Sequence, residues 1–319
     1  MKKIIAVLTA VLLTFAGCGT QNKGTASAGS GNKEVVTFTD ALDRKVSIEK
    51  NPERVAALIG SFADVWCIAG GTVCASVDDA WTDFRLELDD AVNLGGSHSP
   101  SLELLLSANP DFVIASASTA SNVEMREVLE NAGIITAYFD VDCFEDYLAM
   151  LDICTDITGR KDLYEKNGVN IKTQIEKIKK ECIEADLPES ERKVLLIRTA
   201  ASVIKAKGSE GTILGEMLAD LGCINIADSD NTLLDNLSIE SVIRQEPYRI
   251  FVVTMGSDTQ KALDNFNRMM EENPAWGSLE AIKENRMYIM DKKLFNIKPN
   301  AKWAQAYEKI REILLETKK

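Results

Sequence analysis

SLELLLSANPDFVIAS at residues 101–116 and SIESVIRQEPYRIFVV at residues 238–253 follow the same pattern. Each segment predicts a short helix, a turn marked by proline, and a strand. Proline continues neither element, and an apolar run without polar alternation is typical of a parallel strand that is buried on both faces. The spacing from the glutamate to the proline is also the same in both segments. The chain therefore contains an internal duplication.

The sequence upstream of each segment extends this duplication. Residues 53–58 and 191–197 both begin with charged residues and continue as an apolar run, which predicts a buried strand that leads into a helix. The first helix ends before Gly70, and the second, around residues 214–221, ends before Gly222, as expected for a residue that favours helix termini. Strands alternate with helices in both halves. The predicted fold class is therefore α/β, with two Rossmann-like lobes built on central, mainly parallel sheets.

The chain divides by composition. The start has two lysines and then an uncharged apolar run, which is typical of a signal peptide and too short for a membrane-spanning helix. A polar Gly/Ser/Thr/Asn stretch follows, and it cannot bury enough apolar surface to fold. Ile171, Ile175, Ile178 and Cys182 recur at steps of three and four residues, which predicts a single long helix that connects the two lobes as a spine. The predicted domains are a signal peptide at 1–17, a lipidated cysteine and tether at 18–33, an N-terminal lobe at 34–160, a spine helix at 161–187 and a C-terminal lobe at 188–319.

The net charge limits the class of binding partner, and the cysteine spacing limits the kinds of metal or redox site. The formal charge of -13 disfavours nucleic acid, since no basic patch interleaved with aromatic residues compensates for it. No cysteine lies in a C-x-x-C pair, so neither a zinc knuckle nor a dithiol redox motif is present. The six cysteines after Cys18 could pair, with Cys67 and Cys74 as the nearest couple, or remain free as small buried hydrophobic residues.

The sequence offers little for catalysis. It contains no G-x-S-x-G elbow, no phosphate loop and no G-x-G-x-x-G after a strand, and His98 is the only histidine for acid–base work. The same single histidine disfavours a site for bare zinc or manganese, which needs several convergent ligands. We therefore expect a binding protein rather than an enzyme, with no cofactor and no metal site of its own. A membrane-anchored hydrolase that uses carboxylates is the remaining enzymatic alternative.

Several segments resemble the iron-complex and cobalamin class of ABC-importer binding proteins, in which one rigid helix joins two lobes. The resemblance spans nearly all of the chain after the tether. Asp43 departs from the glycine that is usual in the first hairpin turn, but aspartate tolerates left-handed geometry. Phe15-Ala16-Gly17-Cys18 also resembles the lipobox of bacterial lipoproteins, with Cys18 as the lipidated residue. The segments that carry the family resemblance are residues 39–46, 51–55, 100–103, 109–114, 218–222, 237–240, 273–276 and 298–300.

The resemblance implies a function. It implies an extracytoplasmic solute-binding lipoprotein, monomeric and lipid-anchored to the cell membrane, which captures a ferric siderophore or haem between its lobes. The ligand would pass to an ABC permease dimer with its ATPase subunits. In this class, a glutamate in each lobe docks onto arginines of the two permease subunits, and Glu103 and Glu240 occupy those motif positions. The alternatives are a corrinoid (cobalamin) binding protein of the same importer class, and a sensory or adhesive lipoprotein without a transporter.

Ligands of open α/β sheets bind outside the carboxyl ends of the parallel strands. In the loop after the second strand, Trp81 has little local core to join and could contact a large planar ligand. Arg198 follows a buried strand and could hold a carboxylate or an anionic iron chelate, or else form a salt bridge within its lobe. His98 could provide an axial ligand to haem, or be a solvated loop residue. The predicted ligand-binding residues are Ser61, Phe62, Trp81, His98, Ser118, Arg198, Ser202 and Met255.

Overall fold

Residues 34–256 and 258–316 are described by a computed structural model. From Glu34 onward they cluster into one unit, which contains both predicted lobes. The predicted signal peptide at 1–17, the tether at 18–33 and Cys18 lie outside the described residues. Within the part that is described, no helix is long and apolar enough to cross a membrane.

The N-terminal lobe begins with an antiparallel hairpin of β1 (Val35–Thr39) and β2 (Lys45–Glu49). Asp43 adopts a φ of 57° in its turn, so the predicted left-handed turn forms with aspartate. Asp40 holds the turn together, because its Oδ1 accepts hydrogen bonds from the backbone N–H groups of Leu42 and Arg44, both at 3.0 Å. The Arg44 guanidinium also pairs with the Asp40 carboxylate at 2.7 Å.

The main sheet of this lobe is entirely parallel, in the order β5-β4-β3-β6-β7. All five residues of strand β6, Phe112–Ser116, are buried, as expected for a parallel strand covered on both faces. The strands are β3 (Val55–Ala57), β4 (Ala75–Ser76), β5 (Val92–Asn93), β6 (Phe112–Ser116) and β7 (Ile135–Phe139). The helices are α1 (Gly60–Ile68), α2 (Asp79–Thr82), α3 (Leu102–Ser107), α4 (Ala120–Glu124), α5 (Arg126–Asn131) and α6 (Phe144–Thr158).

The C-terminal lobe has the sheet order β10-β8-β11-β12, all parallel, and β9 adds to β8 as an antiparallel strand. The predicted mainly parallel sheet is thus present in each lobe. The strands are β8 (Lys193–Thr199), β9 (Ile204–Lys207), β10 (Ile224–Asn225), β11 (Arg249–Thr254) and β12 (Met287–Met290). The helices are α9 (Glu189–Arg192), α10 (Ile213–Asp220), η2 (Ile226–Ser229), α11 (Asn231–Asn236), α12 (Ile239–Gln245), α13 (Thr259–Glu272), η3 (Pro274–Ser278), α14 (Glu280–Lys283) and α15 (Lys292–Phe295).

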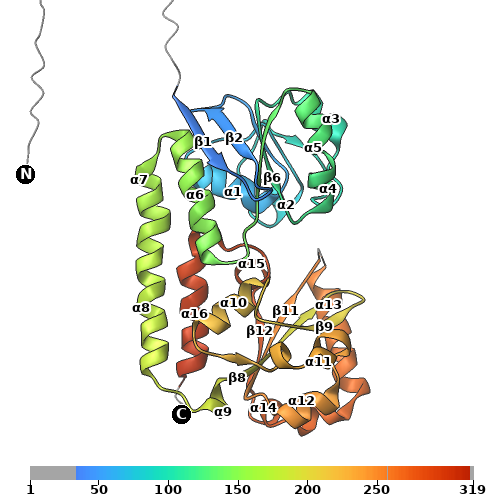
Figure 1. Cartoon of the computed structure of the whole chain (residues 1–319). Coiled ribbons are helices and arrows are strands. Elements are labelled where there is room, and N and C mark those ends of the chain that lie inside the picture. Colours follow the sequence, from blue (N-terminus) through green and yellow to red (C-terminus); the bar gives the residue numbers. More distant parts are fainter. Residues whose placement is uncertain (1–33, 257, 317–319) are drawn as a thin grey trace, which may run out of the picture. The chain divides into compact units, whose positions relative to one another are not determined.

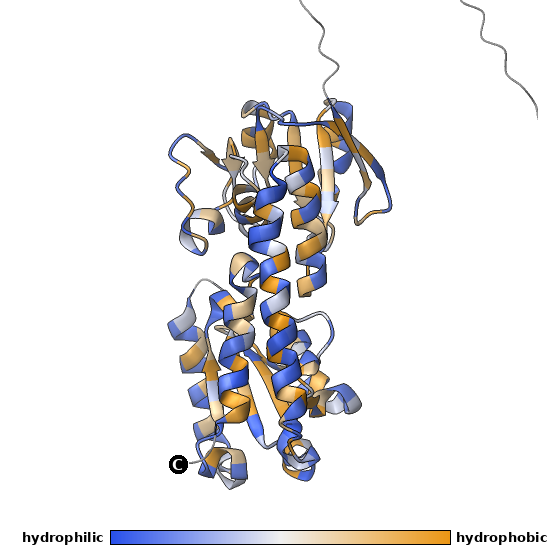
Figure 2. Cartoon of the chain, turned by 90° about the vertical axis from the view of Figure 1, so that its left-hand side faces the viewer, coloured by the Kyte–Doolittle hydropathy of each residue, from blue (hydrophilic) through white to orange (hydrophobic). Residues whose placement is uncertain are grey.

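The predicted spine is a helical run made of α7 (Lys161–Tyr164), a π-helical turn η1 (Glu165–Val169) and α8 (Asn170–Glu184) (Figure 1). Its buried face carries the predicted apolar stripe, and its many hydrophilic residues are visible in Figure 2. The C-terminal helix α16 (Trp303–Leu315), reached through η4 (Asn300–Lys302), packs beside α8. The link between the lobes is therefore broader than the single helix that was predicted.

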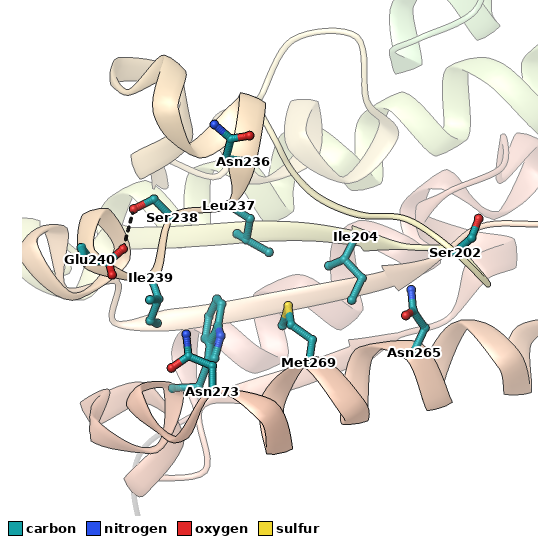
Figure 3. Close-up of a pocket in the computed structure, with 11 residues that line it drawn as sticks. Ser202, Ile204, Asn236, Leu237, Ser238, Ile239, Glu240, Asn265, Met269 and Asn273 are labelled. Atoms are coloured by element: carbon teal, nitrogen blue, oxygen red, sulfur yellow. Dashed lines mark hydrogen bonds between the residues drawn. The ribbon is translucent and has the colours of Figure 1, made fainter.

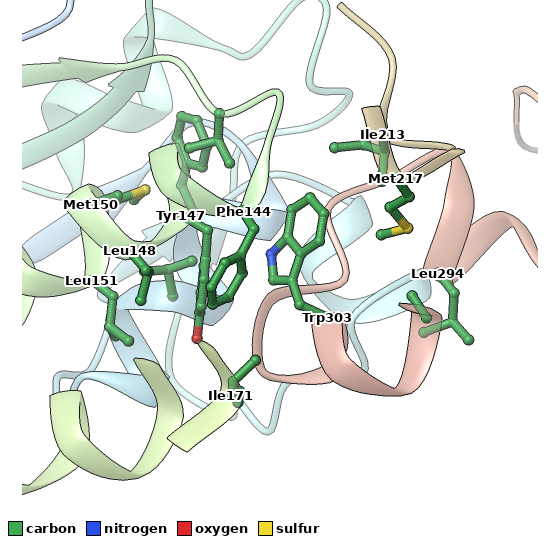
Figure 4. Close-up of a cluster of buried hydrophobic side chains, with 14 of the residues drawn as sticks. Phe144, Tyr147, Leu148, Met150, Leu151, Ile171, Ile213, Met217, Leu294 and Trp303 are labelled. Carbon is green, nitrogen blue, oxygen red and sulfur yellow. The ribbon is translucent and has the colours of Figure 1, made fainter. Parts of the chain in front are cut away.

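One apolar core runs through both lobes and the helices between them. Trp303 is fully buried in it and meets Phe144 of the N-terminal lobe edge to face, with ring centroids 5.8 Å apart. In Figure 4, Trp303 lies between Phe144 and the side chains of Ile213 and Met217 from the C-terminal lobe. Continuous packing of this kind resists a large change in the lobe-to-lobe angle, because close-packed cores rearrange in discrete steps.

The internal duplication extends to the backbone. Ser101 and Ser238 cap α3 and α12 in the same way, since each hydroxyl accepts a hydrogen bond from the backbone N–H three residues later, at 3.3 and 3.4 Å. Asn109 and Glu246, which precede the two prolines, share the left-handed φ of 48°. Residues 101–116 and residues 238–253 therefore form equivalent structural units.

All six cysteines of the described part are free, so Cys67 and Cys74 form no disulfide. Cys154 and Cys182 are buried among apolar side chains. Burial raises the pKa of Cys154 to about 12, which keeps its thiol protonated and unreactive at neutral pH. Cys154 and Cys182 therefore act as small hydrophobic residues.

Candidate ligand-binding site

A cavity of about 200 Å³, here called the Arg198 pocket, lies between the segment that leaves β7 and the C-terminal lobe. Three basic side chains and one acidic side chain line it. Its residues are Asp142, Leu196, Arg198, Lys207, Gly211, Thr212, Ile213, Leu214, Val253, Phe295, Asn296 and Lys298.

Arg198 is positioned by the strand pairing of the C-terminal sheet. It lies in β8, in register with Val253 of β11 and Lys205 of β9. Partial burial lowers the pKa of Arg198, and no neighbouring charge counters this effect. Among the described residues no carboxylate forms an ion pair with it. A guanidinium stays charged at physiological pH, so this side chain is available to an anionic ligand.

Lys207 and Lys298 bring further positive charge to the pocket. The pKa of Lys207 is lowered by burial and by the positive charges of Arg198 and Lys205. Asp142 arrives from the N-terminal lobe, and its pKa is raised by burial and by Asp140, while Lys298 lowers it. The basic side chains of this pocket repel one another, and an anion that binds between them reduces this repulsion.

A second and larger cavity of about 710 Å³, the Lys292 pocket, lies next to the first, because Val253 lines the Arg198 pocket and Thr254 lines this one. Both flank the carboxyl end of β11, which is where ligands of α/β sheets bind. The lining of the Lys292 pocket has four basic and two acidic side chains. The residues are Asp83, Phe84, Arg85, Thr254, Thr259, Ile289, Met290, Asp291, Lys292, Lys293 and Lys302.

An ion pair crosses this pocket from lobe to lobe. Lys292 Nζ of α15 lies 3.1 Å from Asp83 Oδ2, which follows α2 in the N-terminal lobe. Both side chains are largely shielded from solvent, at 16% and 25% exposure, so salt screens the attraction between them less than in an ordinary surface salt bridge. It fixes the loop after α2 against the C-terminal lobe.

Asp79, the first residue of α2, fixes the start of α1. Its Oδ1 accepts a hydrogen bond from the Gly60 backbone N–H at 3.0 Å. A side chain at Gly60 would collide with the Ala80 backbone, so the close approach requires glycine. Burial, with a contribution from Asp83, raises the pKa of Asp79 to about 6.

We predict that Asp79→Asn stabilises the protein at neutral pH. The folded pKa is above the unfolded value, so the stability that Asp79 contributes is present at low pH and is lost as pH rises through about 6. Asparagine keeps the acceptor for Gly60 and removes the buried charge. The gain in unfolding free energy should be about 1 kcal/mol larger at pH 7.5 than at pH 5, as measured by urea denaturation. The exposed neighbour Asp78→Asn serves as control, and an equal gain at both pH values would contradict the prediction.

Two predicted ligand contacts, Ser61 and Phe62, are only 2% exposed. Helix α1 begins at Gly60, so both residues lie in its first turn, and their side chains are buried rather than exposed to a cleft. Phe62 packs edge to face on Phe139, and the Ser61 carbonyl accepts a hydrogen bond from Asn300 Nδ2 at 2.9 Å. They link structural elements, and we leave both out of the proposed site.

Three further predicted residues, in the N-terminal lobe, lie outside the two pockets. Trp81 belongs to α2, where a polar loop was expected, and packs half-buried against the apolar core. His98 is exposed, with its Nδ1 3.4 Å from Ser97 Oγ. Ser118 is exposed and its hydroxyl lies 3.1 Å from Ser116 Oγ. Of these, none lines the cavities that contain Arg198 and Lys292.

Ser202 and Met255 do not share a pocket with Arg198. Met255 is 42% exposed just beyond β11. Ser202 lies at the rim of a separate groove of about 480 Å³ on the C-terminal lobe (Figure 3). In that figure Ile204, Met269 and Asn265 point into the groove, and Glu240 stands at its other end. The predicted site residues are therefore dispersed among the described residues, and of this set Arg198 alone lines one of the two pockets described above.

Both predicted docking residues are exposed in the first turn of their helices, Glu103 in α3 and Glu240 in α12. The pKa of Glu240 is lowered by backbone hydrogen bonding and by the Ser238 hydroxyl, which donates to its Oε2 at 3.0 Å. Their position favours a carboxylate, as the helix dipole predicts.

Sequence reasoning missed the basic residues that surround Arg198. Lys207 pairs with Leu196 across the β8–β9 hairpin, and Leu196 shares a strand face with Arg198. Predicting a hairpin turn at residues 199–204 would have placed Lys207 opposite Leu196 and so near Arg198. Lys292 and Lys298 reach the cleft only because the chain returns toward the N-terminal lobe after β12, and local sequence gives no sign of that.

Comparison with known proteins identifies the family. Residues 55–294 match the family described as periplasmic binding protein. The chain belongs to this family. The predicted family and the two-lobed α/β fold are thereby confirmed. The Fe(3+)-citrate-binding protein YfmC of Bacillus subtilis (strain 168) is 23% identical to this periplasmic binding protein over 297 residues, which cover 91% of this chain and 90% of the relative.

Two further comparisons agree. The ABC transporter substrate-binding lipoprotein YvrC of Bacillus subtilis (strain 168) is 23% identical over 301 residues, covering 91% of each chain. Among solved structures, the siderophore-binding protein BauB, bound to a complex of acinetobactin and ferric iron, aligns with a TM-score of 0.71 at 16% identity. The alignment covers 89% of this chain and all of BauB. At that identity the likeness concerns the fold.

Proposed function

We propose that this periplasmic binding protein serves an ABC importer and captures an anionic iron complex between its lobes. The observation that carries the proposal is the charge of the cleft. The chain as a whole has a formal charge of -13, yet basic side chains outnumber acidic ones in both the Arg198 pocket and the Lys292 pocket. Cations gathered at one cleft of an acidic protein attract and hold an anionic ligand.

The proposed ligand is an iron complex that carries carboxylates, such as ferric citrate or a carboxylate siderophore. Arg198 offers a planar pair of donors that matches a carboxylate, and Lys207 and Lys298 add point charges. The relative YfmC is named for binding ferric citrate, which supports this class. Haem is a weaker candidate because His98 lines neither pocket. A corrinoid, which offers fewer anionic groups, would make less use of these cations.

We further propose that the ligand is passed to a permease with two membrane subunits, which dock onto Glu103 and Glu240. The two glutamates occupy equivalent positions of the duplicated unit and are exposed. An arginine on each permease subunit would complement them. The relative YvrC is named as a substrate-binding component of an ABC transporter, which supports such a partner.

Lipid anchoring through Cys18 is also a proposal. The relative YvrC is named a lipoprotein, and the sequence before Cys18 resembles a lipobox. We predict that Cys18→Ala releases the protein from the membrane fraction into the soluble fraction, because a single residue would carry the anchor. Immunoblotting of fractionated cells measures this. Cys67→Ala is the matched control, and retention of the Cys18→Ala variant in the membrane fraction would disprove the anchor.

Iron uptake tests the proposed function. Cells that lack this chain are expected to lose uptake of radioactive iron supplied as ferric citrate, and the intact chain should restore it. Haemin and cobalamin serve as separate probes, each with its own label. Undiminished uptake of all three in cells without the chain would contradict a transport role.

A further inference from the structure

Helices α3 and α12, which carry Glu103 and Glu240, share a second exposed feature. Leu106 in α3 and Ile243 in α12 are 36% and 39% exposed, and each stands three residues after the glutamate of its helix. Residues three apart are neighbours on one helix face. Each helix therefore presents an apolar side chain beside a carboxylate. Because the two helices have equivalent caps and equivalent turns, these side chains are displayed by equivalent backbones.

A single exposed leucine or isoleucine is common on protein surfaces and needs no explanation. Here, however, an exposed aliphatic side chain occurs at the equivalent position of both helices. Adjacent positions of the same two helices have diverged: Leu104 is 42% exposed, whereas its equivalent Ser241 is buried, and Ser107 corresponds to Arg244. The exposed apolar position is shared by the two lobes at the place where it adjoins a glutamate.

Charge indicates the kind of partner that covers these faces. Neither the Glu103 nor the Glu240 carboxylate forms an ion pair with a described residue, although Glu240 accepts the hydrogen bond from Ser238. Two unpaired acids, each next to an apolar group, are complementary to two cations, each next to an apolar recess. A partner with two equivalent subunits provides that arrangement, whereas a single asymmetric partner would have to match it twice.

We propose that Leu106 and Ile243 are the apolar anchors of the contact with the two transmembrane subunits of the importer. This inference rests on the proposed function and adds a contact that the glutamates alone do not provide. Each anchor fills a recess beside the basic residue that meets the neighbouring glutamate, and so excludes water from that ion pair. Charged contacts strengthen when surrounding contacts remove solvent.

The test compares paired substitutions in the full-length chain, expressed as the only copy in cells that take up radioactive iron from ferric citrate. Leu106→Ser with Ile243→Ser is expected to reduce uptake about tenfold or more, as the loss of two buried aliphatic side chains implies. Ferric citrate affinity and melting temperature of the purified variant should stay unchanged. The conservative pair Leu106→Met with Ile243→Met should retain uptake.

The control pair is Val128→Ser with Ile224→Ser, whose side chains are 40% and 38% exposed on other surfaces. An equal loss of uptake in the control pair, or full uptake in the Leu106→Ser and Ile243→Ser pair, would contradict the role of these two side chains as anchors. If the anchors are dispensable while Glu103→Ala with Glu240→Ala abolishes uptake, only this inference is wrong. If the unaltered chain supports no uptake of any probe, the proposed function is wrong and the anchors fall with it.

Discussion

Replacing Arg198 by alanine is expected to weaken the binding of ferric citrate by about 30-fold or more. Removing one partner of a shielded, hydrogen-bonded charge pair costs about 2 to 5 kcal/mol, and every 1.4 kcal/mol is tenfold in affinity. Arg198 has no ion-pair partner among the described residues, so its removal takes away a ligand contact without leaving a carboxylate of the protein unpaired. Isothermal titration calorimetry measures the change.

The matched control is Lys205→Ala. Lys205 lies directly across from Arg198 in the β8–β9 hairpin but is exposed and does not line the Arg198 pocket. Its loss should change affinity by less than about threefold, since exposed charges are well screened. Arg198→Lys should give an intermediate loss, because lysine keeps the charge but not the planar pair of donors. Equal affinities for the Arg198→Ala variant and the unaltered protein would remove Arg198 from the site.

The second large effect is expected from Glu103→Ala combined with Glu240→Ala, which should abolish iron uptake while leaving ligand affinity unchanged. Charge pairs that become desolvated at an interface are coupled by about 1.5 to 7 kcal/mol, enough to dominate a transient complex. As helix-start residues alone, the two glutamates would each contribute only about 0.3 to 1 kcal/mol to stability. Uptake, calorimetry and thermal melting measured in parallel separate these roles.

The exposed acids Glu124 and Glu271 provide a control pair, one from a helix of each lobe. Their replacement by alanine should leave uptake intact, because neither lies at the start of a duplicated helix. Normal uptake in the Glu103→Ala and Glu240→Ala double variant would refute docking through these residues. A large fall in melting temperature would instead assign the glutamates to helix stability.

Much of the fold could be predicted because its signals are local. The strands Phe112–Ser116 and Arg249–Thr254 are fully buried and contain the continuous apolar runs 112–115 and 250–253, and the apolar stripe of α8 recurs at helical spacing. The duplicated segments also show the same helix, turn and strand pattern twice, which supports the prediction of each unit. The left-handed turn at Asp43 followed from the conformational tolerance of aspartate.

The site was harder to predict because it depends on where distant segments meet. The strand-end rule located Arg198 but could not show that α1 starts so early that Ser61 and Phe62 face the core. Trp81 was expected in a loop, yet the segment folds as α2 and its side chain joins the core. The charge of the cleft depends on Lys292 and Lys298, which reach it through the return of the chain after β12.

Direct titration of the purified protein with ferric citrate, haemin and cobalamin, followed by tryptophan fluorescence and calorimetry, tests the central claim that this chain binds an anionic iron complex. We expect saturable one-to-one binding of ferric citrate with a dissociation constant of about 1 μM or below, weakened by salt because the cleft acts through charge. Citrate without iron and the Arg198→Ala variant are the controls. Binding of cobalamin alone, or no heat and no fluorescence change with any of the three, would contradict the account.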